Sequence, residues 1–441
     1  MELESGTFGA IGNLQVSPRS IRAKELGTFN ANVPLKERVG KDHPSFKQIP
    51  KFFVPPPKPE DKVRRLLHQE AHSLFLQRQA DELLNLDDMN DLWKTLEKYV
   101  TETTRSRQQL VNLDDYLNVV AEVGVKCRKI MTVELFFELL VTSNFPDMLE
   151  IISIYNYMMR RVLLVQGSIA LSFYDEIGQG YLNESDLESY ITDIIPTLAQ
   201  VSERLQPSFE SFYVCTVVKK IFFFLDHLHL RRIRIRDIVS SGLLSQLLEL
   251  HDTAILKDAA EIKTTNWFSV SAVLEVYENY LDLDRDHDGM LSRKELSEYG
   301  SGSLTTIFLD RAFEVCRTYG GEMDYRTFLD FYFAMEHRKT LPALHYIFRI
   351  LDINQQGYLT AQTLRYFFDG IEERIKAVQA EEVNFQDLKD EIFDMIRPKD
   401  ALKITVKDLI NSGQGATVVS ILIEFDKFLA YENREQNHQN V

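Results

Sequence analysis

Residues 284–295 read Asp-Arg-Asp-His-Asp-Gly-Met-Leu-Ser-Arg-Lys-Glu. Oxygen-bearing side chains stand at positions 1, 3, 5, 9 and 12 of this stretch, and Gly289 stands at position 6, where the chain must turn sharply. This is the pattern of an EF-hand loop, which surrounds a Ca²⁺ ion with oxygen ligands. The predicted metal ligands are Asp284, Asp286, Asp288, the backbone carbonyl of Met290, Ser292, directly or through water, and Glu295, through both carboxylate oxygens.

The four carboxylates of this loop also predict how an ion would act on it. Four like charges within twelve residues repel one another, and a divalent cation relieves that repulsion, so ion binding and ordering of the loop should be coupled. The alternative is an acidic surface loop that matches Asp-x-Asp-x-Asp-Gly by chance. All six ligand positions, the glycine and the apolar Leu291 at position 8 are filled together, which favours a calcium site.

The helix pattern that precedes this loop recurs elsewhere in the chain. In an EF-hand, apolar residues stand eight, five, four and one positions before the loop, and another stands at loop position 8, where paired hands join. Loops that begin at Asp175, Asp226 and Asp352 follow most of this pattern. The sequence therefore contains an internal repeat of irregular spacing. The apolar residues at position 8 of the four loops are Leu182, Ile233, Leu291 and Leu359.

The three other loops lack parts of the ligand set. The Asp352 loop has Thr363 at position 12 instead of a carboxylate, so we expect it to bind Ca²⁺ weakly or not at all. The Asp175 loop has Ile177 at position 3, which cannot coordinate a metal. We interpret these copies as hands kept as scaffold. The Asp226 loop has, in place of ligands and glycine, Leu228, Leu230 and Arg231.

EF-hands pair because each leaves an apolar face that a neighbour must cover. We extend this to a similar unit between about residues 85 and 165. The alternative is a set of generic amphipathic helices, which periodicity alone does not distinguish from hands. The predicted fold class is all-α, an elongated array of paired EF-hand-like helix-loop-helix units, most without metal ligands. The predicted pairs are the Asp175 loop with the Asp226 loop, the Asp284 loop with a ligand-free hand near residues 316–328, and the Asp352 loop with one near residues 397–408.

Five segments follow from this pattern. Residues 1–60 are rich in Gly, Ser and Pro, and the run Pro-Pro-Pro-Lys-Pro at 55–59 forbids a helix there, so we expect a flexible tail or linker. The other segments are an N-terminal helical, EF-hand-like domain (61–165), a degenerate EF-hand pair (166–262), the pair with the intact calcium loop (263–338), and a degenerate pair with C-terminal helices (339–441).

Composition limits the classes to which the protein can belong. Its 441 residues include 50 basic and 66 acidic side chains, and the net charge of −16 argues against nucleic acid as a partner. The cysteines, Cys127, Cys215 and Cys316, are few and far apart, which fits a reducing compartment and buried structural thiols. The N-terminus lacks the pattern of a secretory signal, and no run of about 18 apolar residues occurs. We therefore expect an intracellular soluble protein without membrane insertion.

No catalytic signature is found in the sequence. The patterns Gly-x-Ser-x-Gly and His-Glu-x-x-His and the P-loop are all absent. Residues 178–180 and 413–415, both Gly-Gln-Gly, are fragments of a dinucleotide fingerprint that we interpret as turns, because neither has the third glycine. His227 and His229 lack the further ligands that a transition metal needs. We therefore do not expect an enzyme.

Basic residues gather in one short run, Arg-Arg-Ile-Arg-Ile-Arg at 231–236. The alternation would place guanidinium groups on one side of an extended segment, where they could bind phosphate or an acidic surface. The alternative is a solvated face of a strand or helix without a partner. We treat the run as a candidate partner contact.

Several stretches, taken in order, resemble a known family. They are Ile-Pro-Lys-Phe-Phe at 49–53, Phe-Leu-Gln-Arg at 75–78, Ile-Phe-Phe-Phe-Leu-Asp at 221–226, Asn-Trp-Phe-Ser at 266–269, the loop at 284–295, Gly-Glu-Met-Asp-Tyr at 321–325, Lys-Asp-Glu-Ile-Phe-Asp-Met at 389–395, and Tyr-Glu-Asn-Arg-Glu at 431–435. Together they resemble the B″ regulatory subunits of protein phosphatase 2A, and the gamma branch in particular. The resemblance covers nearly the whole chain beyond the tail.

This resemblance implies a non-catalytic subunit that sits on a HEAT-repeat scaffold, contacts the catalytic subunit, and selects substrates or location. Larger members have a second well-formed loop, but the Asp352 loop departs from that pattern, so the resemblance does not imply a second ion here. The gamma branch and its plant relatives are associated with centrosomes, microtubule arrays and the cortical cytoskeleton, and with cytoplasm and nucleus. The family's calcium ligands map onto Asp284, Asp286, Asp288, Met290, Ser292 and Glu295, all of which match.

Three functional hypotheses follow. In the first, Ca²⁺ orders the 284–295 loop and so changes how its hand pair holds the scaffold or catalytic subunit. In the second, the chain is a calcium-responsive cytoskeletal adaptor that acts independently of a phosphatase. In the third, it is a structural protein whose Ca²⁺ never dissociates. The family stretches favour the first.

Overall fold

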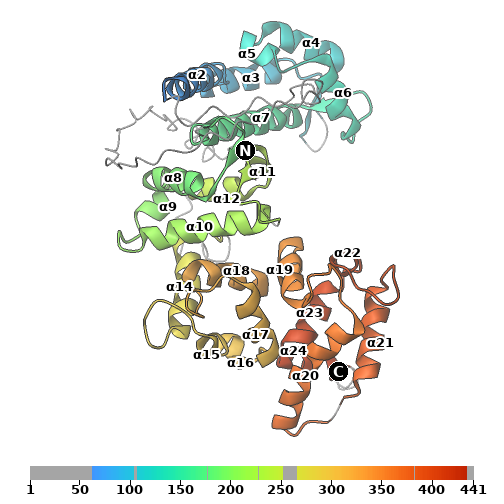
Figure 1. Cartoon of the computed structure of the whole chain (residues 1–441). Coiled ribbons are helices and arrows are strands. Elements are labelled where there is room, and N and C mark those ends of the chain that lie inside the picture. The colour runs from blue at the N-terminus through green and yellow to red at the C-terminus, as the bar shows by residue number, and fades with distance from the viewer. Residues whose placement is uncertain are drawn as a thin grey trace, which may run out of the picture. The chain divides into compact units, whose positions relative to one another are not determined.

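The computed structural model (Figure 1) describes residues 62–103, 107–175, 177–226, 228–251, 266–381 and 383–434. The tail or linker predicted for residues 1–60, with its proline-rich run, lies outside the described residues, as do His227 and Glu435. Within the described residues, helices account for most of the chain, and each strand has only two or three residues. The predicted all-α array of helix-loop-helix units is therefore confirmed.

The described residues divide into two units, and the division falls inside helix α7, Ile151–Ser172. The smaller unit contains the described residues between 62 and 162, with 177 and 178. The larger unit contains 163–175 and the described residues from 179 to 434. The limits of the five segments predicted from the sequence are finer than this division and stay predictions.

The smaller unit consists of helices joined by one short sheet. Asn85, Asn112 and Thr132 cap three of its helices by accepting a hydrogen bond from the backbone N–H three residues later. The elements are α2 (Lys62–Asp81), α3 (Leu86–Lys98), β1 (Glu102–Thr103), β2 (Gln109–Val111), α4 (Leu113–Glu122), α5 (Val125–Arg128), α6 (Val133–Val141), β3 (Leu149–Glu150) and the first part of α7.

Strand β2 is the centre of this sheet and pairs antiparallel with both β1 and β3. Leu110 lies opposite Glu150, and Val111 lies opposite Leu149. The segments α3–β2–α4 and α6–β3–α7 are thus joined strand to strand, which is the arrangement of paired hands. None of these three strands was predicted, because two or three residues are too few to show an alternating pattern.

The larger unit contains the three hand pairs predicted from Asp175 onward. Its elements, after the end of α7, are β4 (Tyr181–Leu182), α8 (Glu184–Ile194), η2 (Ile195–Thr197), α9 (Ala199–Ser202), α10 (Glu210–Leu225), β5 (Ile233–Arg234), α11 (Ile235–Ser240), α12 (Leu243–Leu248), η3 (Glu249–His251), α14 (Val270–Leu283), α15 (Arg293–Leu296), α16 (Tyr299–Gly302), α17 (Thr306–Val315), α18 (Tyr325–Glu336), α19 (Leu341–Leu351), α20 (Ala361–Ala377), α21 (Phe385–Ile396), α22 (Val406–Asn411), α23 (Gly415–Ile423) and α24 (Phe425–Glu432).

The apolar residues at loop position 8 join the hands of each pair. Leu182 of β4 lies opposite Ile233 of β5. Leu291 and Met323 exchange backbone hydrogen bonds of 2.8 and 2.9 Å, and Leu359 exchanges bonds of the same two lengths with Ile404. All six side chains are buried. The three loop pairings predicted from the sequence are therefore confirmed.

Helix α10 connects the hand pairs of the larger unit. It packs against α8, which lies above it in Figure 1, and against α14 and α18, which lie below it. Its end is apolar all round, as expected for a helix buried on several sides. Ile221 and Phe222 enter the core of the Asp175–Asp226 pair, whereas Phe223 lies 5.7 Å from the ring of Phe333 in α18, between ring centroids.

Two further expectations concern cysteines and membranes. The three cysteines are free thiols, with Cys127 and Cys316 buried and Cys215 partly buried, which agrees with the predicted structural role. In the part of the chain that the structure describes, no helix combines the length and apolar character needed to cross a bilayer.

Candidate calcium site

Helix α14 positions the first predicted ligand. Its N-cap, Ser269, accepts a hydrogen bond from a backbone N–H of the first turn, and Val276, Tyr280 and Leu283 are buried. These apolar residues recur at steps of four and three, so they lie on one face of the helix and fix its rotation. The helix ends at Leu283, and Asp284 therefore begins the loop.

The loop is closed by contacts between its start and its middle. Gly289 has a φ of 83°, in the left-handed region that favours glycine. Its backbone N–H donates to Asp284 Oδ2 at 3.1 Å, and its carbonyl accepts a hydrogen bond of 2.6 Å from the Tyr280 hydroxyl. At its far end the loop continues into α15, where Ser292 and Glu295 form a capping box.

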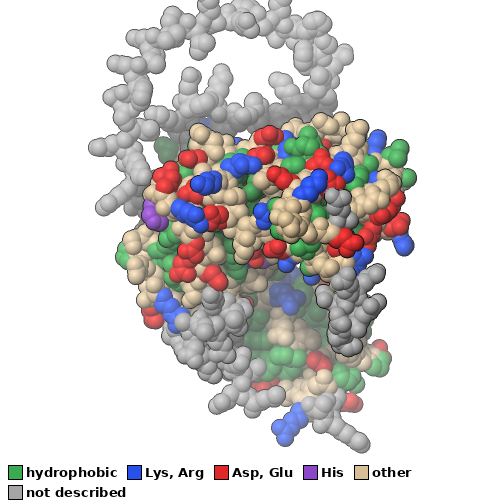
Figure 2. Space-filling view, turned by 90° about the horizontal axis from the view of Figure 1, so that it is seen from below, with side chains coloured by type: hydrophobic (Ala, Val, Ile, Leu, Met, Phe, Trp, Pro, Cys, Tyr) green, Lys and Arg blue, Asp and Glu red, His purple; other side chains and the backbone are tan. Residues whose placement is uncertain are grey.

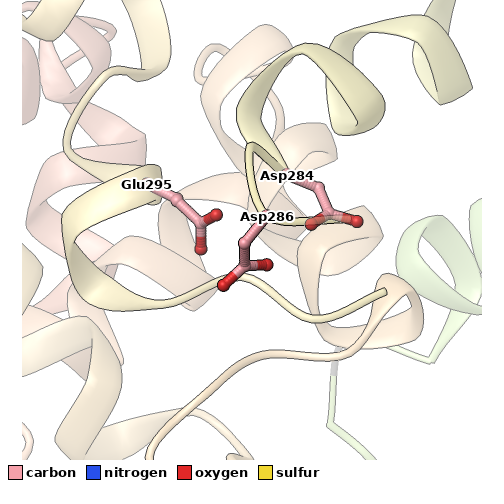
Figure 3. Close-up of side chains that lie close together, drawn as sticks. All are labelled: Asp284, Asp286 and Glu295. Carbon is pink, nitrogen blue, oxygen red and sulfur yellow. The ribbon is translucent and has the colours of Figure 1, made fainter. Parts of the chain in front are cut away.

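Three carboxylates come together in this loop. Asp284, Asp286 and Glu295 each offer one oxygen, and these oxygens all lie within 4.8 Å of one another. Figure 3 shows Asp284 and Asp286 on the loop and Glu295 at the start of the helix that follows it. Among the described residues, no other group of three or more acidic, His or Cys side chains meets this condition. The spacing suits a divalent cation with oxygen ligands.

Asp284 provides the test of whether an ion fits. Its side chain is buried, with the residue only 2% exposed, yet its Oδ1 has no hydrogen-bond partner among the described residues. A buried carboxylate oxygen without a partner is unfavourable, because it has lost its water and gained nothing in exchange. A cation bound by the three carboxylates would supply the missing partner, so these residues fit a Ca²⁺ ion.

Glu295 is held in position by hydrogen bonds. Its Oε1 accepts the backbone N–H of Arg285 at 3.0 Å, and its Oε2 accepts the backbone N–H and the hydroxyl of Ser292 at 2.9 and 2.7 Å. Burial alone would raise the pKa of Glu295, but these hydrogen bonds lower the pKa below its ordinary value. The group is therefore a carboxylate at neutral pH, the form in which it can bind a metal.

The other predicted ligands lie in the loop but outside this cluster. Asp288 Oδ1 accepts the backbone N–H of Met290 at 2.7 Å, and Ser292 donates its hydroxyl to Glu295. The structure thus brings together Asp284, Asp286 and Glu295 of the six predicted ligands. The assignment of all six as ligands stays a prediction.

The aspartates at position 1 of the other loops are bonded differently. Both oxygens of Asp352 accept backbone N–H groups, from positions 5 and 6 of its loop, at 3.0 and 2.6 Å. Both oxygens of Asp226 do the same, at 2.8 and 2.7 Å. The loop backbone thus satisfies these two carboxylates without an ion, whereas one oxygen of Asp284 has no hydrogen-bond partner in the described part of the chain. This difference supports the interpretation of the Asp226 and Asp352 loops as scaffold.

An open groove of about 1370 Å³ lies beside the candidate calcium site. Asp282, in α14, and Glu298, in the segment that follows α15, both line it, so part of its wall lies close to each end of the loop. Arg338 and Glu424 lie on another part of the wall and form a largely buried ion pair. No sequence pattern signals this groove, because its residues come from helices more than a hundred positions apart.

The face in Figure 2 carries acidic and basic side chains interspersed with one another. Ion pairs of this kind recur in the larger unit, for example between Arg365 and Asp369 and between Arg434 and Glu391. Part of the acidic surface of the larger unit is therefore neutralised locally by arginine side chains.

Comparison with known families identifies the hands themselves. Residues 171–253 match a family model described as an EF-hand domain. This match covers the Asp175 and Asp226 loops and ends before the Asp284 loop. The model therefore recognises the helix pattern of a pair in which ligands are missing.

Comparison with curated proteins extends over nearly the whole chain. The zebrafish (Danio rerio) B″ gamma regulatory subunit of serine/threonine-protein phosphatase 2A is 48% identical over 391 residues, which cover 89% of this chain and 84% of the relative. The human protein of the same name is 48% identical, with 88% and 85% covered. A probable B″ regulatory subunit of Arabidopsis thaliana, TON2, is 33% identical, with 88% and 82% covered.

A solved structure is also similar. A chain of a structure described as a PP2A PR70 holoenzyme, with the label diCa, aligns with a TM-score of 0.52 and 26% identity. The alignment covers 57% of this chain and 92% of that chain. The curated relatives are named as regulatory subunits rather than as catalytic ones, which confirms the prediction that the chain is not an enzyme. Its identity to them over most of both lengths shows that this chain belongs to the B″ family of protein phosphatase 2A regulatory subunits, close to its gamma members.

Proposed function

We propose that this chain is a non-catalytic, calcium-binding regulatory subunit of protein phosphatase 2A, which binds the scaffold and catalytic subunits and directs substrate choice or location. The observation that carries the proposal is the 48% identity to B″ gamma subunits over 89% of the chain. The likeness to a chain of a phosphatase holoenzyme supports an assembly with the other subunits.

The calcium part of the proposal rests on the Asp284 loop. Three carboxylate oxygens converge there, and the buried Oδ1 of Asp284 lacks any other partner among the described residues. A Ca²⁺ ion supplies a divalent charge that holds these oxygens together. Asp284, Asp286 and Glu295 would hold the ion, with Asp288, Met290 and Ser292 completing the set.

The groove beside the loop offers a route from ion binding to partner binding. Ordering the loop fixes the angle between α14 and α15. Asp282, in α14, and Glu298, two residues after α15, both lie on the groove wall. A partner that contacts this wall would therefore bind differently with and without the ion. Regulation by cellular calcium requires an affinity on the order of 10⁻⁷ to 10⁻⁵ M.

For location, we propose the cytoplasm and nucleus, with centrosomal or microtubule-associated partners. The support is the likeness to the gamma branch and to the plant protein TON2. Imaging of the tagged chain beside a centrosomal marker tests this, and a signal that never overlaps the marker would contradict the centrosomal part.

The decisive experiment is gel filtration of the purified chain with the scaffold–catalytic dimer of phosphatase 2A, in calcium and in chelator. We expect co-elution in calcium and weaker co-elution in chelator. Co-elution of equal strength in both buffers would leave a regulatory subunit whose ion is structural. No co-elution in either buffer would overturn the phosphatase assignment and leave a calcium-responsive adaptor.

Two variants test whether the effect of calcium on co-elution requires ion binding at the Asp284 loop. Glu295→Gln removes a predicted ligand and should abolish the effect of calcium on co-elution. Thr363→Ala changes the same position of the Asp352 loop, which has no closing carboxylate, and serves as the matched control, with no expected change in calcium response. If Glu295→Gln lost calcium binding but kept the calcium-dependent co-elution, the proposed regulation would be wrong.

A further inference from the structure

The arginine run at 231–236 takes the alternating form that its sequence predicts. Ile233 and Ile235 are buried, whereas Arg232, Arg234 and Arg236 are exposed. The buried isoleucines anchor β5 and the start of α11 in the core of the hand pair. The three arginines therefore project from the side of the chain that faces solvent.

Tyr181, on the neighbouring strand β4, orients two of these arginines. The guanidinium carbon of Arg232 lies 4.8 Å from the centroid of the Tyr181 ring, and that of Arg234 lies 5.7 Å from it. Arg234 Nε also donates a hydrogen bond of 3.1 Å to the Tyr181 hydroxyl. Stacking on an aromatic face restrains a guanidinium without neutralising it. The two charges are thus held in place for a partner.

None of these arginines forms an ion pair with a carboxylate among the described residues. Arginines elsewhere in the larger unit commonly do: Arg326 pairs with Glu184 and Glu188. Although the chain has a net charge of −16, these six residues carry four positive charges, of which Arg234 is attracted by the carboxylate of Asp237 without forming an ion pair with it among the described residues. Like charges this close repel one another, and a group of opposite charge would relieve that repulsion.

Arg231 occupies a backbone position that glycine fills in the other loops. It stands at loop position 6 with a φ of 58°, where Gly180, Gly289 and Gly357 have φ values of 76°, 83° and 79°. Its backbone N–H donates to Asp226 Oδ2 at 2.7 Å, as those of the three glycines do to their own aspartates. A glycine would meet this backbone requirement without steric strain. Arginine supplies nothing to the backbone here that glycine would not supply, so what it adds at this position is its side chain.

Two leucines extend the surface beside the arginines. Leu228 and Leu230 stand at positions 3 and 5 of the loop, where a calcium-binding hand has ligands, and they are 64% and 61% exposed. Apolar side chains this exposed gain free energy when a partner covers them. The segment 228–236 thus combines exposed apolar groups with restrained, unpaired guanidinium groups.

We propose that residues 228–236 form a docking surface for an acidic segment of a protein partner, with carboxylates on the arginines and apolar side chains over Leu228 and Leu230. Side chains at alternate positions of an extended chain are about 6.6 Å apart, so carboxylates at alternate positions of an extended partner segment match Arg232 and Arg234. Guanidinium groups bind carboxylates through paired hydrogen bonds. The surface does not depend on the phosphatase assignment, because it rests on the segment's own geometry.

The test is fluorescence anisotropy of a labelled ten-residue peptide in which Glu and Leu alternate, titrated with the full chain. The control peptide has Gln in place of every Glu. We expect saturable binding of the acidic peptide that weakens as salt rises, and at least tenfold weaker binding of the Gln peptide. Failure to bind the acidic peptide, or equal binding of both peptides, would overturn the proposal.

Variants locate the binding on the chain. Arg232→Gln with Arg234→Gln should weaken binding at least tenfold, whereas Arg204→Gln with Arg317→Gln, which removes the same charge from exposed arginines elsewhere, should not. Arg317 also stacks on a tyrosine, Tyr319, at 4.9 Å, which makes it a close match. Equal weakening by both double variants would show a general charge effect and contradict the assigned surface.

Arg231→Gly separates binding from folding. Because glycine relieves the backbone strain, we expect this variant to unfold at a higher temperature than the wild type while binding the acidic peptide several-fold more weakly. A lower unfolding temperature with unchanged binding would count against the proposal. Flotation with vesicles that contain phosphatidylserine distinguishes the other anionic surface: if the chain bound vesicles through these arginines but not the peptide, the protein partner would be wrong.

Discussion

Asp284 and Asp352 stand at the same position of their loops, yet the structure gives them different environments. Asp352 has both oxygens bonded to backbone N–H groups, and Asp284 has one oxygen buried without a partner among the described residues. The sequence predicts that the two loops differ, because Thr363 replaces the closing carboxylate. It does not predict the unpaired oxygen, since hydrogen bonds between a side chain and a loop backbone depend on coordinates rather than on residue type.

Asp284→Asn should act in opposite directions with and without calcium. In chelator the substitution removes one of the charges that repel within the cluster, so the free energy of unfolding should rise by about 0.5–1 kcal/mol. In calcium the variant loses a ligand and with it the stabilisation by bound ion, about 2.7 kcal/mol at a hundredfold excess over the dissociation constant. Urea unfolding in both buffers measures the two differences.

Asp352→Asn is the matched control for this prediction. It weakens hydrogen bonds to the backbone in a loop without a closing carboxylate, so it should lower the unfolding free energy by about 1 kcal/mol in both buffers. If Asp284→Asn in chelator lowered the unfolding free energy by as much as Asp352→Asn does, the unpaired oxygen of Asp284 would have no energetic effect.

Lys220 is a second residue whose environment the sequence does not reveal. Its ammonium lies 3.4 Å from the centroid of the Trp267 ring and 5.5 Å from that of Phe268, and it forms no ion pair among the described residues. Burial lowers the pKa of Lys220 to about 7. In the unfolded chain a lysine has a pKa of about 10.4, so between these values the unfolded state binds more protons.

Lys220→Met should therefore be more stable than the wild type at pH 7, and the gap should narrow toward pH 9. The reason is that stability of the wild type rises with pH wherever the unfolded state binds more protons, whereas methionine carries no proton. Urea unfolding of both proteins at pH 7, 8 and 9 measures the gap.

The neighbouring Lys219 provides the control. It forms an ion pair with Asp330 at 2.9 Å, so Lys219→Met leaves a carboxylate without its partner and should be destabilising at each pH. If Lys220→Met were less stable than the wild type at pH 7, the aromatic surroundings would be stabilising the charged form instead.

At the scale of elements, pairing was predictable because it depends on one position in each loop. The apolar residue at position 8 enters the bridge in every pair of the larger unit, and in the second pair Leu291 meets Met323. Helix starts also depend on local sequence, since Thr305 and Thr405 cap the helices that follow them. The contacts between hand pairs were not predictable. Phe223 and Phe333 belong to helices with similar apolar patterns, and neither pattern indicates which helix it packs against.

The ion pair between Arg338 and Glu424 is such a contact between elements. It connects the end of α18 to the start of α24, with 13% and 8% of the side chains exposed, and Arg338 also donates to Ser420. Arg338→Ala leaves Glu424 buried without a partner, so we expect a loss of about 3–5 kcal/mol in the free energy of unfolding. Chemical denaturation of the purified variant measures this loss.

The exposed pair of Arg365 with Asp369 is the comparison. Arg365→Ala should cost less than about 1 kcal/mol, because water screens both charges. Equal effects of the two substitutions would mean that burial does not set the cost of breaking the Arg338–Glu424 pair.

At the scale of the whole molecule, the sequence predicted the family and the order of the hands but not the groove. The family is encoded in ordered local stretches, such as residues 321–325, which are readable one at a time. The groove joins Asp282, Arg338 and Glu424, whose proximity exists only after the segments that hold the Asp284 and Asp352 pairs have packed together. No local pattern can signal a surface of that kind.

The two units predict how the intact chain unfolds. Each has buried residues of its own, such as Tyr116 in the smaller unit and Phe328 in the larger, and the Asp284 loop lies in the larger. We expect calorimetry to show two transitions, of which calcium raises only one, because ligand stabilises the unit that binds it. Glu295→Gln should remove this shift. A single transition that moves as a whole would mean that the two units unfold together.

The hydrogen bond from the backbone N–H at loop position 6 to the aspartate at position 1 makes the shape of a loop independent of its ability to bind an ion. It occurs in the loops that begin at Asp175, Asp226, Asp284 and Asp352, with or without a full ligand set. Architecture and ion response are therefore inherited through different atoms: the backbone keeps the shape while substitutions at positions 3, 5 and 12 silence or restore a sensor. A substitution at one of these positions removes a metal ligand but leaves this hydrogen bond in place.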